Sequence, residues 1–458
     1  MLVPAVPHRI MDLPDSLRRP LVNHSEKGAR AVMLFAIWWG YRAYDRNFNP
    51  EWFGWAWNPG GNVGANFRTY QYAAELALEG QSFYGVAPPG LAEWAVYLYP
   101  PITVTAYYPF TGLEWMTGYW LLVGLNALAG VGVAAAIVRF LDRVDRRLGW
   151  VDVALIVGLF LASPFTFGTI YYGNINLLVA AAFVSGFLAL DDGRETVAGT
   201  AFGLAALFKL FPALVGAWLL RRRSWRSIAA ATVVGVGGIL AGVVAYGWEP
   251  TATFFSDVVV DRTETAAFAG GYPVDSTFYV TFQRPLSHLL WGVFPDAPPE
   301  LLTPLAALLG AAVLAVFYVD VETRQDRLLA IFATLVVTVT VVPALQWYLV
   351  LLFFPMVPLW YVWDGPGRRL FLVGGVVMFA NATPGGLVSG IREYGLPNLL
   401  ESALVSVVTF ASVPLYGIAI MLLAGALAKY GLRPDRTALR AVGRIRRAVS
   451  GQQSGRSR

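Results

Sequence analysis

Residues 115–140 read WMTGYWLLVGLNALAGVGVAAAIVRF, an apolar run whose single charge, Arg139, stands next to its end. A helix needs about 20 consecutive, mostly apolar residues to cross the hydrocarbon core of a bilayer. This run therefore predicts a membrane-crossing helix. Because comparable runs recur along the whole chain, the sequence predicts an all-α polytopic membrane protein.

The composition agrees with that class. Of the 458 residues, 57% are hydrophobic and 14% are charged, whereas soluble domains carry roughly 25% charged residues. There are no cysteines, which excludes disulfides, thiol catalysis and thiolate metal sites. The three histidines, His8, His24 and His288, are far apart in sequence, so neither a histidine metal site nor a Ser-His-Asp triad is expected.

We expect about 10 full spans plus one helical hairpin. The spans are predicted near 29–44, 115–140, 151–171, 173–190, 228–247, 301–319, 328–343, 346–362, 370–382 and 402–428. A further apolar stretch, 195–220, is broken by Lys209 and Pro212. Proline in a helix interior removes a hydrogen bond and kinks or ends the helix.

The basic residues predict the orientation, since short flanks rich in Lys and Arg stay in the cytoplasm. Such clusters occur at 9–30, 143–147, 221–226, 324–327, 368–369 and 429–458. Because Arg194 and Arg221 fall on the same side, residues 195–220 must enter and return, with the hairpin tip between Lys209 and Pro212. The net charge of +5 is thus topological, and no nucleic-acid partner is expected.

Three regions follow from this topology, all in a plasma-membrane protein with both termini cytoplasmic. Residues 1–28 form a cytoplasmic arm, 29–428 the transmembrane domain, and 429–458 a basic tail that lies on the anionic inner leaflet or is disordered. No cleavable signal peptide is expected, and the first apolar run should be an uncleaved span.

Long connections are predicted on the outer face, at 45–114, 248–300 and 383–401. The first two far exceed the usual connection of about 4–6 residues, and retained long loops usually carry function. Residues 69–78 have a helical apolar stripe, which favours an interfacial helix lying on the membrane. No internal repeat is evident, which disfavours a transporter.

The first outer connection concentrates aromatic and polar side chains, among them Arg68, Tyr70 and Tyr99. Aromatic faces with hydrogen-bond donors suit sugar rings, although an aromatic belt at the membrane boundary would look the same. Further along, Asn174 and Asn176 begin a helix, where they could bind an anion or simply cap backbone N–H groups.

Lys209 is an ionisable group in an apolar stretch, which marks a functional candidate. Its ammonium group could hold a phosphate, or it could snorkel to the interface. In the second long connection, Asp275, Ser276 and Arg284 precede a span, and Arg284 could grip a phosphate bidentately. Gln346 and Trp347 interrupt two apolar runs, as is tolerated where backbone lines a cavity or is buried in protein.

These segments, in this order, resemble glycosyltransferase family 87 of the C-type superfamily. The resemblance rests on NFRTYQYAAELALEGQSFYG and YPP in the first outer connection, on GNIN at 173–176, on Lys209 and Pro212 before a basic turn, and loosely on Asp275, Ser276 and Arg284. It covers roughly residues 30–400. A histidine often found in the family near Gln346 and Trp347 is absent.

The resemblance implies an inverting, metal-independent hexosyltransferase, similar to polyprenyl-phosphate-mannose-dependent mannosyltransferases. Such an enzyme would move a sugar from a polyprenyl-phosphate donor to a lipid or glycan acceptor on the outer face, with an acidic residue of the first external loop as general base. Asn66 occupies that acid position here. Asp45 and Glu75 are the nearest substitutes. The alternative is a non-catalytic lipid-carrier-binding or transport protein that retains the fold.

Overall fold

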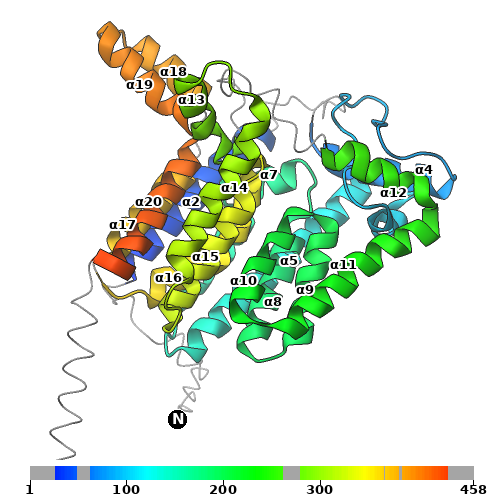
Figure 1. Cartoon of the computed structure of the whole chain (residues 1–458), viewed down its shortest axis with the longest axis horizontal. Helices are drawn as coiled ribbons and strands as arrows, with labels where there is room; N and C mark the ends of the chain where they lie inside the picture. The colour runs from blue at the N-terminus through cyan, green and yellow to red at the C-terminus, as the bar shows by residue number, and fades with distance from the viewer. Residues whose placement is uncertain (1–25, 49–61, 261–278, 366, 381–383, 432–458) are drawn as a thin grey trace, which may run out of the picture.

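The structure is a computed structural model that describes residues 26–48, 62–260, 279–365, 367–380 and 384–431. It is almost entirely helical, with one two-stranded ladder. Figure 1 shows two groups of helices side by side. One group contains α2 (Lys27–Phe48), α14 (Leu302–Tyr318), α15 (Arg324–Thr340), α16 (Phe353–Val362), α17 (Gly367–Phe379) and α20 (Val413–Ala426); the other contains α5 (Trp115–Arg143), α8 (Asn176–Asp191), α9 (Glu195–Phe208), α10 (Gly216–Arg222) and α11 (Trp225–Tyr246).

Four of the described helical segments are long and apolar enough to cross a bilayer. They are Trp115–Arg143, Trp225–Tyr246, Pro299–Tyr318 and Val413–Tyr430. A fifth arises if α6 (Trp150–Ala162) and α7 (Pro164–Tyr171), which meet at 42°, form one bent span. The chain is therefore a multi-pass membrane protein, as predicted. The finer count of about ten spans stays a prediction, since the other apolar helices are shorter than a bilayer crossing.

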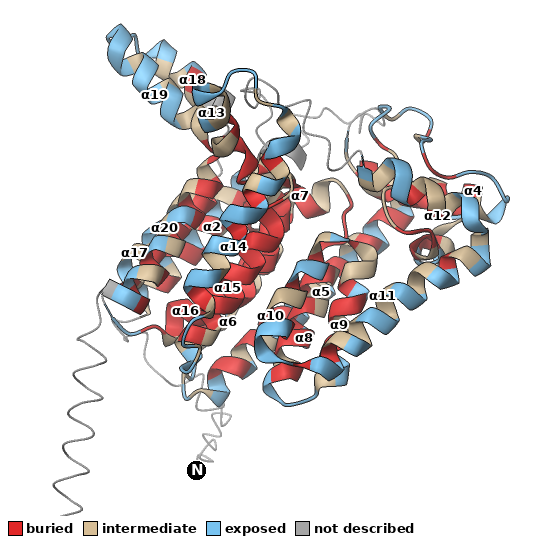
Figure 2. Cartoon of the chain, viewed as in Figure 1, coloured by how far each residue is buried: buried red, intermediate tan, exposed pale blue. Residues whose placement is uncertain are grey.

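Burial separates the interior helices from the outer ones. Helices α15 and α16 are buried almost throughout, whereas α11 buries little of its apolar surface within the protein (Figure 2). An apolar helix with few protein contacts matches a lipid environment, because in a soluble protein that surface would be covered.

The basic flanks gather at one end of the bundle, which we call the arginine end. Contacts there join the ends of different helices. Arg143 pairs with Asp192, Arg222 with Asp191, Arg146 with Asp364 and Arg30 with Asp152, while Arg221 donates to the carbonyl of Tyr318 and Lys429 to that of Phe317. One shared end is what the predicted zigzag requires. Most of the predicted arm and most of the predicted tail lie outside the described residues.

The predicted hairpin folds back on itself. Helix α9 leaves the arginine end and stops at Lys209, whose backbone is extended. The short helix η2 (Phe211–Val215) and α10 then return, so that Arg222 reaches Asp191 at the end of α8. Close approaches of Gly199 to Ser227 and of Gly203 to Ala231 show that α9 and α11 run parallel. Because α9 and α11 run in the same direction, the chain between them must return from the end of α9 to the level where α9 begins.

The opposite end, which we call the lysine end, carries the predicted long connections. The first contains α4 (Ala65–Leu78), as the apolar stripe predicts, and the 3₁₀ helix η1 (Pro101–Phe110) packed on it. The second contains α12 (Trp248–Thr253), the π-helical turn η3 (Phe254–Val259) and α13 (Gln283–Val293); the short helix η5 (Pro299–Leu301) leads into α14. Strand β1 (Tyr279–Val280) pairs antiparallel with β2 (Ala344–Leu345), which leads into η6 (Gln346–Leu352).

Two predictions near the C-terminus were wrong. The connection expected at 383–401 is largely helical, with α18 (Pro384–Glu393) and the start of α19 (Asn398–Phe410). The single span expected at 402–428 breaks after Phe410, because Ser412 is non-helical and Pro414 begins α20, which continues into η7 (Leu427–Gly431). Figure 1 shows α13, α18 and α19 together, away from α4 and α12.

Candidate functional site

Lys209 is the most unusual side chain at the lysine end. It is only 3% exposed, and its Nζ donates to the hydroxyls of Tyr99 and Tyr348, both at 3.1 Å. The ammonium also lies 5.1 Å and 4.4 Å from the centres of those two rings. Phenol oxygens and ring faces therefore replace water around this charge, as a desolvated cation requires.

A different local feature of the chain positions each of these three residues. Lys209 stands where α9 ends before Pro212, Tyr99 precedes the two prolines that open η1, and Tyr348 lies in η6 directly after the strand pair. Segments that are more than a hundred residues apart thus converge on one ammonium group.

The contacts continue from Tyr99 into α4. Tyr70 shares a 2.8 Å hydrogen bond between its hydroxyl and that of Tyr99, and its ring packs 4.7 Å from that of Tyr107. The hydroxyl of Tyr84 donates to the carbonyl of Tyr99 at 2.6 Å. The predicted sugar-binding residues Tyr70 and Tyr99 are thus brought to Lys209.

A second path leads from Tyr348 back to α4. Its neighbour Trp347 packs 4.8 Å from the ring of Tyr172, and the carbonyl of Tyr172 accepts the backbone N–H of Asn66 at 2.8 Å. Asn66 precedes Tyr70 by one helical turn. Side-chain contacts, one backbone hydrogen bond and two short stretches of chain therefore link seven residues in a closed circuit, which we call the lysine ring: Asn66, Tyr70, Tyr99, Lys209, Tyr348, Trp347 and Tyr172.

Asn174 and Asn176 make hydrogen bonds to other groups of the protein. The Oδ1 of Asn174 accepts the N–H of Ile175 at 2.8 Å, and its carbonyl accepts from Asn126. The Nδ2 of Asn176 donates to Thr169. The Oδ1 atoms of Asn126 and Asn176 are buried and have no hydrogen-bond partner among the described residues. An N–H or O–H donor brought there would fit better than an anion, because both atoms are acceptors.

Arg68 and Glu75 lie away from the lysine ring. Arg68 donates to the carbonyl of Pro89 at 3.1 Å and lies 5.2 Å from the ring of Trp115. Glu75 follows Gln71 by one turn, and Gln71 donates to the carbonyls of Phe110 and Leu113. Positions five apart on a helix differ by about 140°, so Glu75 does not share the face of Tyr70. Burial, and then the neighbouring charge of Glu79, raises the pKa of Glu75.

Asp45 lies at the lysine end of α2. One residue before it, the hydroxyl of Tyr44 donates to the carbonyl of Leu161 at 3.1 Å, and its ring packs edge-on against Phe167 of α7. The last residues of α7 are also those that hold the start of α4, where Asn66 lies. Tyr44, which directly precedes Asp45, and the start of α4 therefore both contact α7 or the residue that ends it.

Arg284 is fully buried in α13, and its Nε donates to the carbonyl of Thr409 in α19 at 2.8 Å. None of the contacts described for Lys209 comes from α13 or α19. Gln346 starts η6 and is half-buried. Asp275 and Ser276 lie outside the described residues.

Tyr348 and Tyr172 join the site, although neither is among the predicted substrate-binding residues. Tyr348 follows the predicted Gln346 and Trp347, and Tyr172 precedes the predicted GNIN segment. Both tyrosines stand beside a break between apolar runs, and this position was the signal in the sequence that could have identified them. The sequence could not predict which residues they contact, because those residues lie in distant segments.

An apolar cavity of about 250 Å³ lies beside the lysine ring. Side chains of η1, α5, α8 and α9 line it, including Tyr107, Phe110 and Phe208. Tyr107 connects the two features, since its ring packs against that of Tyr70. Phe208 directly precedes Lys209 in the chain.

Known proteins give three similarities. A "polyprenol-phosphate-mannose-dependent alpha-(1-2)-phosphatidylinositol pentamannoside mannosyltransferase" of Mycolicibacterium smegmatis is 25% identical over 42% of this chain and 44% of its own. An alpha-(1->3)-arabinofuranosyltransferase of Mycobacterium tuberculosis is 30% identical over 31% of this chain and 32% of its own. The chain thus spans less than half the length of these relatives.

Among solved structures, ArnT from Cupriavidus metallidurans bound to undecaprenyl phosphate is 17% identical, covering 88% of this chain and 78% of ArnT at a TM-score of 0.31. That TM-score does not establish a shared fold. The family model of glycosyltransferase family 87 matches residues 97–355, which is more than half of the chain. This match includes Tyr99, Lys209 and Tyr348 but begins after α4. The chain belongs to glycosyltransferase family 87.

Proposed function

We propose that this protein is a membrane hexosyltransferase that takes its sugar, mannose in the first instance, from a polyprenyl-phosphate donor. The acceptor is a lipid or glycan on the outer face of the plasma membrane, and no metal takes part. The observation that carries the proposal is the buried ammonium of Lys209, held by phenols from two distant segments in a chain of this family.

Lys209 is the proposed phosphate ligand. A phosphate oxygen is a stronger acceptor for an ammonium than a neutral phenol, because charge-assisted hydrogen bonds are roughly twice as strong. The donor phosphate would replace Tyr99 or Tyr348 at Nζ, and the released hydroxyl could donate to a second phosphate oxygen. As the sugar carbon leaves, negative charge grows on that phosphate, and Lys209 stabilises it.

The apolar cavity beside the ring offers a place for the first isoprenoid units of the donor. Its lining joins Tyr107 on the ring side to Leu125 and Leu204, both of which are also exposed on the outer surface of their helices. A branched hydrocarbon chain could run from the ring toward the lipid phase without crossing a charged residue.

Asp45 is the better supported candidate for the base among the two proposed. Its neighbour Tyr44 packs on α7, whose end also holds the start of α4, whereas Glu75 lies about 140° from Tyr70 around α4. A carboxylate at Asp45 would take the proton of the acceptor hydroxyl as the lipid phosphate leaves. Tyr70, Tyr99 and Trp347 offer ring faces for the sugar, with Asn66 as a hydrogen-bond partner rather than a base.

One observation favours the non-catalytic alternative, a protein that binds the lipid carrier without turning it over. No carboxylate contacts Lys209 in the part of the chain that the structure describes. An amide stands at Asn66, where the family resemblance implies an acid. Binding of the carrier without sugar transfer would then be expected.

The deciding experiment uses the full chain in liposomes with radiolabelled polyprenyl-phosphate-mannose and an extract of bacterial membrane lipids. Lys209→Met should lower the rate of label transfer by about 100-fold or more, as expected for the loss of one transition-state charge contact. Lys429→Met is the matched control, because Lys429 is also buried but lies at the arginine end. It should retain transfer.

Two results would argue against the proposal. Equal loss of transfer in both lysine variants would point to misfolding rather than phosphate binding. Retention of the donor by the wild-type chain, with no transfer to any fraction of the extract, would favour the carrier-binding alternative.

A further inference from the structure

A second concentration of positive charge surrounds a pocket at the arginine end, where the hairpin returns. The pocket has a volume of about 490 Å³ and is lined by Trp218, Arg221, Arg222, Arg223, Val321 and Arg327. That volume lies within the range of about 300–1,000 Å³ typical of small-ligand sites. The lysine ring contributes no residue to it.

The arginines reach this pocket from two elements. Arg221 and Arg222 end α10 and Arg223 follows them, whereas Arg327 lies in the first turn of α15. The guanidinium groups of Arg221 and Arg222 have partners, the carbonyl of Tyr318 at 2.7 Å and the carboxylate of Asp191 at 3.7 Å. Those of Arg223 and Arg327 have no acceptor within the described residues.

Trp218 supplies an independent sign of a ligand. The side chain is 1% exposed and lines the pocket, and its Nε1–H has no hydrogen-bond partner among the described residues. A buried indole N–H usually finds an acceptor. A ligand oxygen held by the guanidinium donors of this pocket would supply such an acceptor.

Nearby carboxylates do not fill this role. Asp191 lies outside the lining and pairs with Arg222, and Asp326 completes the capping box of α15 with Thr323. Asp320 and Glu322 flank the lining residue Val321 but are exposed and do not themselves line the pocket. The pocket therefore keeps a cationic character.

The level of the pocket relative to a bilayer follows from exposed aromatics around it. Trp225 is 63% exposed just after Arg223, and Tyr430 is 57% exposed while donating to the carbonyl of Val316 near the end of α14. Exposed Trp and Tyr at the ends of apolar helices mark the headgroup region. This level favours the phosphate of a phospholipid over a phosphate in free solution.

We propose that the pocket lined by Trp218, Arg223 and Arg327 binds the phosphate headgroup of an anionic phospholipid from the leaflet at the arginine end. Arginine forks match phosphate oxygens, and basic pockets between membrane helices are a recognised kind of lipid site. The bound headgroup would join α10 to α15 at the base of the hairpin whose tip is Lys209.

Native mass spectrometry of the detergent-solubilised full chain tests this. Phosphatidic acid should bind about ten-fold more tightly than phosphatidylcholine with the same acyl chains. The double variant Arg223→Gln with Arg327→Gln should lower the affinity for phosphatidic acid by about ten-fold. The matched control is Arg226→Gln with Arg369→Gln, which removes two exposed arginines at the same end that do not line the pocket. This control should bind like the wild type.

Two further measurements complete the design. Trp218→Phe keeps an aromatic ring but removes the N–H, and it should lower the affinity for phosphatidic acid by a few fold. Pyrophosphate at constant ionic strength should compete with phosphatidic acid. The inference is overturned if the control variant loses as much affinity as the pocket variant, or if pyrophosphate binds in an arginine-dependent way while phosphatidic acid does not.

Discussion

At the scale of single residues, the environment of Lys209 is the clearest departure from ordinary packing. A buried ammonium is costly unless its hydrogen bonds are satisfied, and here two neutral phenols accept two of its three N–H groups. Such an arrangement holds the charge without cancelling it, since neither partner carries a countercharge. The same group could thus act later toward an anion.

Tyr99→Phe and Tyr348→Phe should each destabilise the protein by about 1–3 kcal/mol, because each leaves a buried donor with one acceptor fewer. The double variant should lose more unfolding free energy than the two single variants together, since Lys209 then keeps neither phenol as an acceptor. Unfolding free energies in mixed micelles measure this. In a Lys209→Met background both losses should shrink; undiminished costs there would show that the hydroxyls serve another partner.

The pKa of Glu75 gives a prediction with a defined sign. Burial raises that pKa above its ordinary value, so the ionised form is disfavoured in the folded state. The penalty is present at neutral pH and disappears as the pH falls through the folded pKa toward that of the unfolded chain. Glu75→Gln should therefore stabilise the protein at pH 7 and be neutral near pH 4. Glu93→Gln, at an exposed residue, is a comparison that should change little. A Glu75→Gln protein that is less stable than the wild type at pH 7 would contradict this prediction.

At the scale of elements, glycines decide how closely α9 and α11 approach. A Cβ on Gly199 would lie 2.1 Å from the carbonyl oxygen of Ser227, and one on Gly203 would lie 2.9 Å from that of Ala231. Small residues allow such contact between membrane helices. This contact positions α9, and with it Lys209 at its end.

Gly199→Ala should cost about 1–3 kcal/mol, because the added methyl group meets backbone that cannot turn aside. Gly235→Ala, on the partner helix with no atom within 4 Å of the added carbon, should instead be neutral or slightly stabilising, as alanine favours helix. Thermal unfolding in one detergent compares the two. A milder effect at Gly199 than at Gly235 would refute the parallel packing described above.

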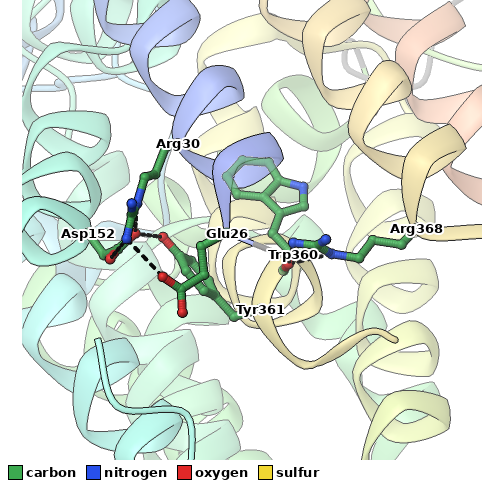
Figure 3. A network of polar contacts seen from close by, with 6 residues as sticks. All are labelled: Glu26, Arg30, Asp152, Trp360, Tyr361 and Arg368. Atoms are coloured by element: carbon green, nitrogen blue, oxygen red, sulfur yellow. Dashed lines mark hydrogen bonds and ion pairs between the residues drawn. The ribbon is translucent and has the colours of Figure 1, made fainter. Parts of the chain in front are cut away.

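At the scale of the whole molecule, a polar cluster joins three helices at the arginine end. Arg30 of α2 makes two hydrogen bonds, of 2.8 and 2.7 Å, to Asp152 of α6, and Tyr361 of α16 donates to the same carboxylate at 2.8 Å (Figure 3). Glu26 also accepts from Arg30, and Arg368 donates to the carbonyl of Trp360 beside this cluster. The carboxylate of Asp152 is fully buried.

Asp152→Asn should therefore destabilise the protein by about 1–3 kcal/mol, because Arg30 loses its fully buried countercharge and keeps only the partly exposed Glu26. Asp192→Asn removes a carboxylate from an exposed pair with Arg143 at the same end, and should cost less than about 1 kcal/mol. Equal costs in a chemical unfolding series would mean that the Asp152 pair is solvated.

The sequence could predict what depends on local composition. Apolar runs and basic flanks predicted the membrane class, the shared arginine end, and the hairpin between Arg194 and Arg221; the stripe beginning at Tyr70 predicted α4. It failed near the C-terminus, because a polar, glycine-containing segment can still be helical. There the helices α18 and the start of α19 were predicted as a connection, and α19 and α20 were predicted as one span.

The sequence by itself determined that this chain crosses a membrane, that its basic turns lie together and that Lys209 interrupts an apolar stretch, because hydropathy and charge act residue by residue. Only the tertiary structure decided that Tyr99 and Tyr348 meet Lys209, that Arg284 turns instead to Thr409, and that Trp218 faces four arginines. Those pairings join segments far apart in the chain, and they are set by how helices pack rather than by any local preference.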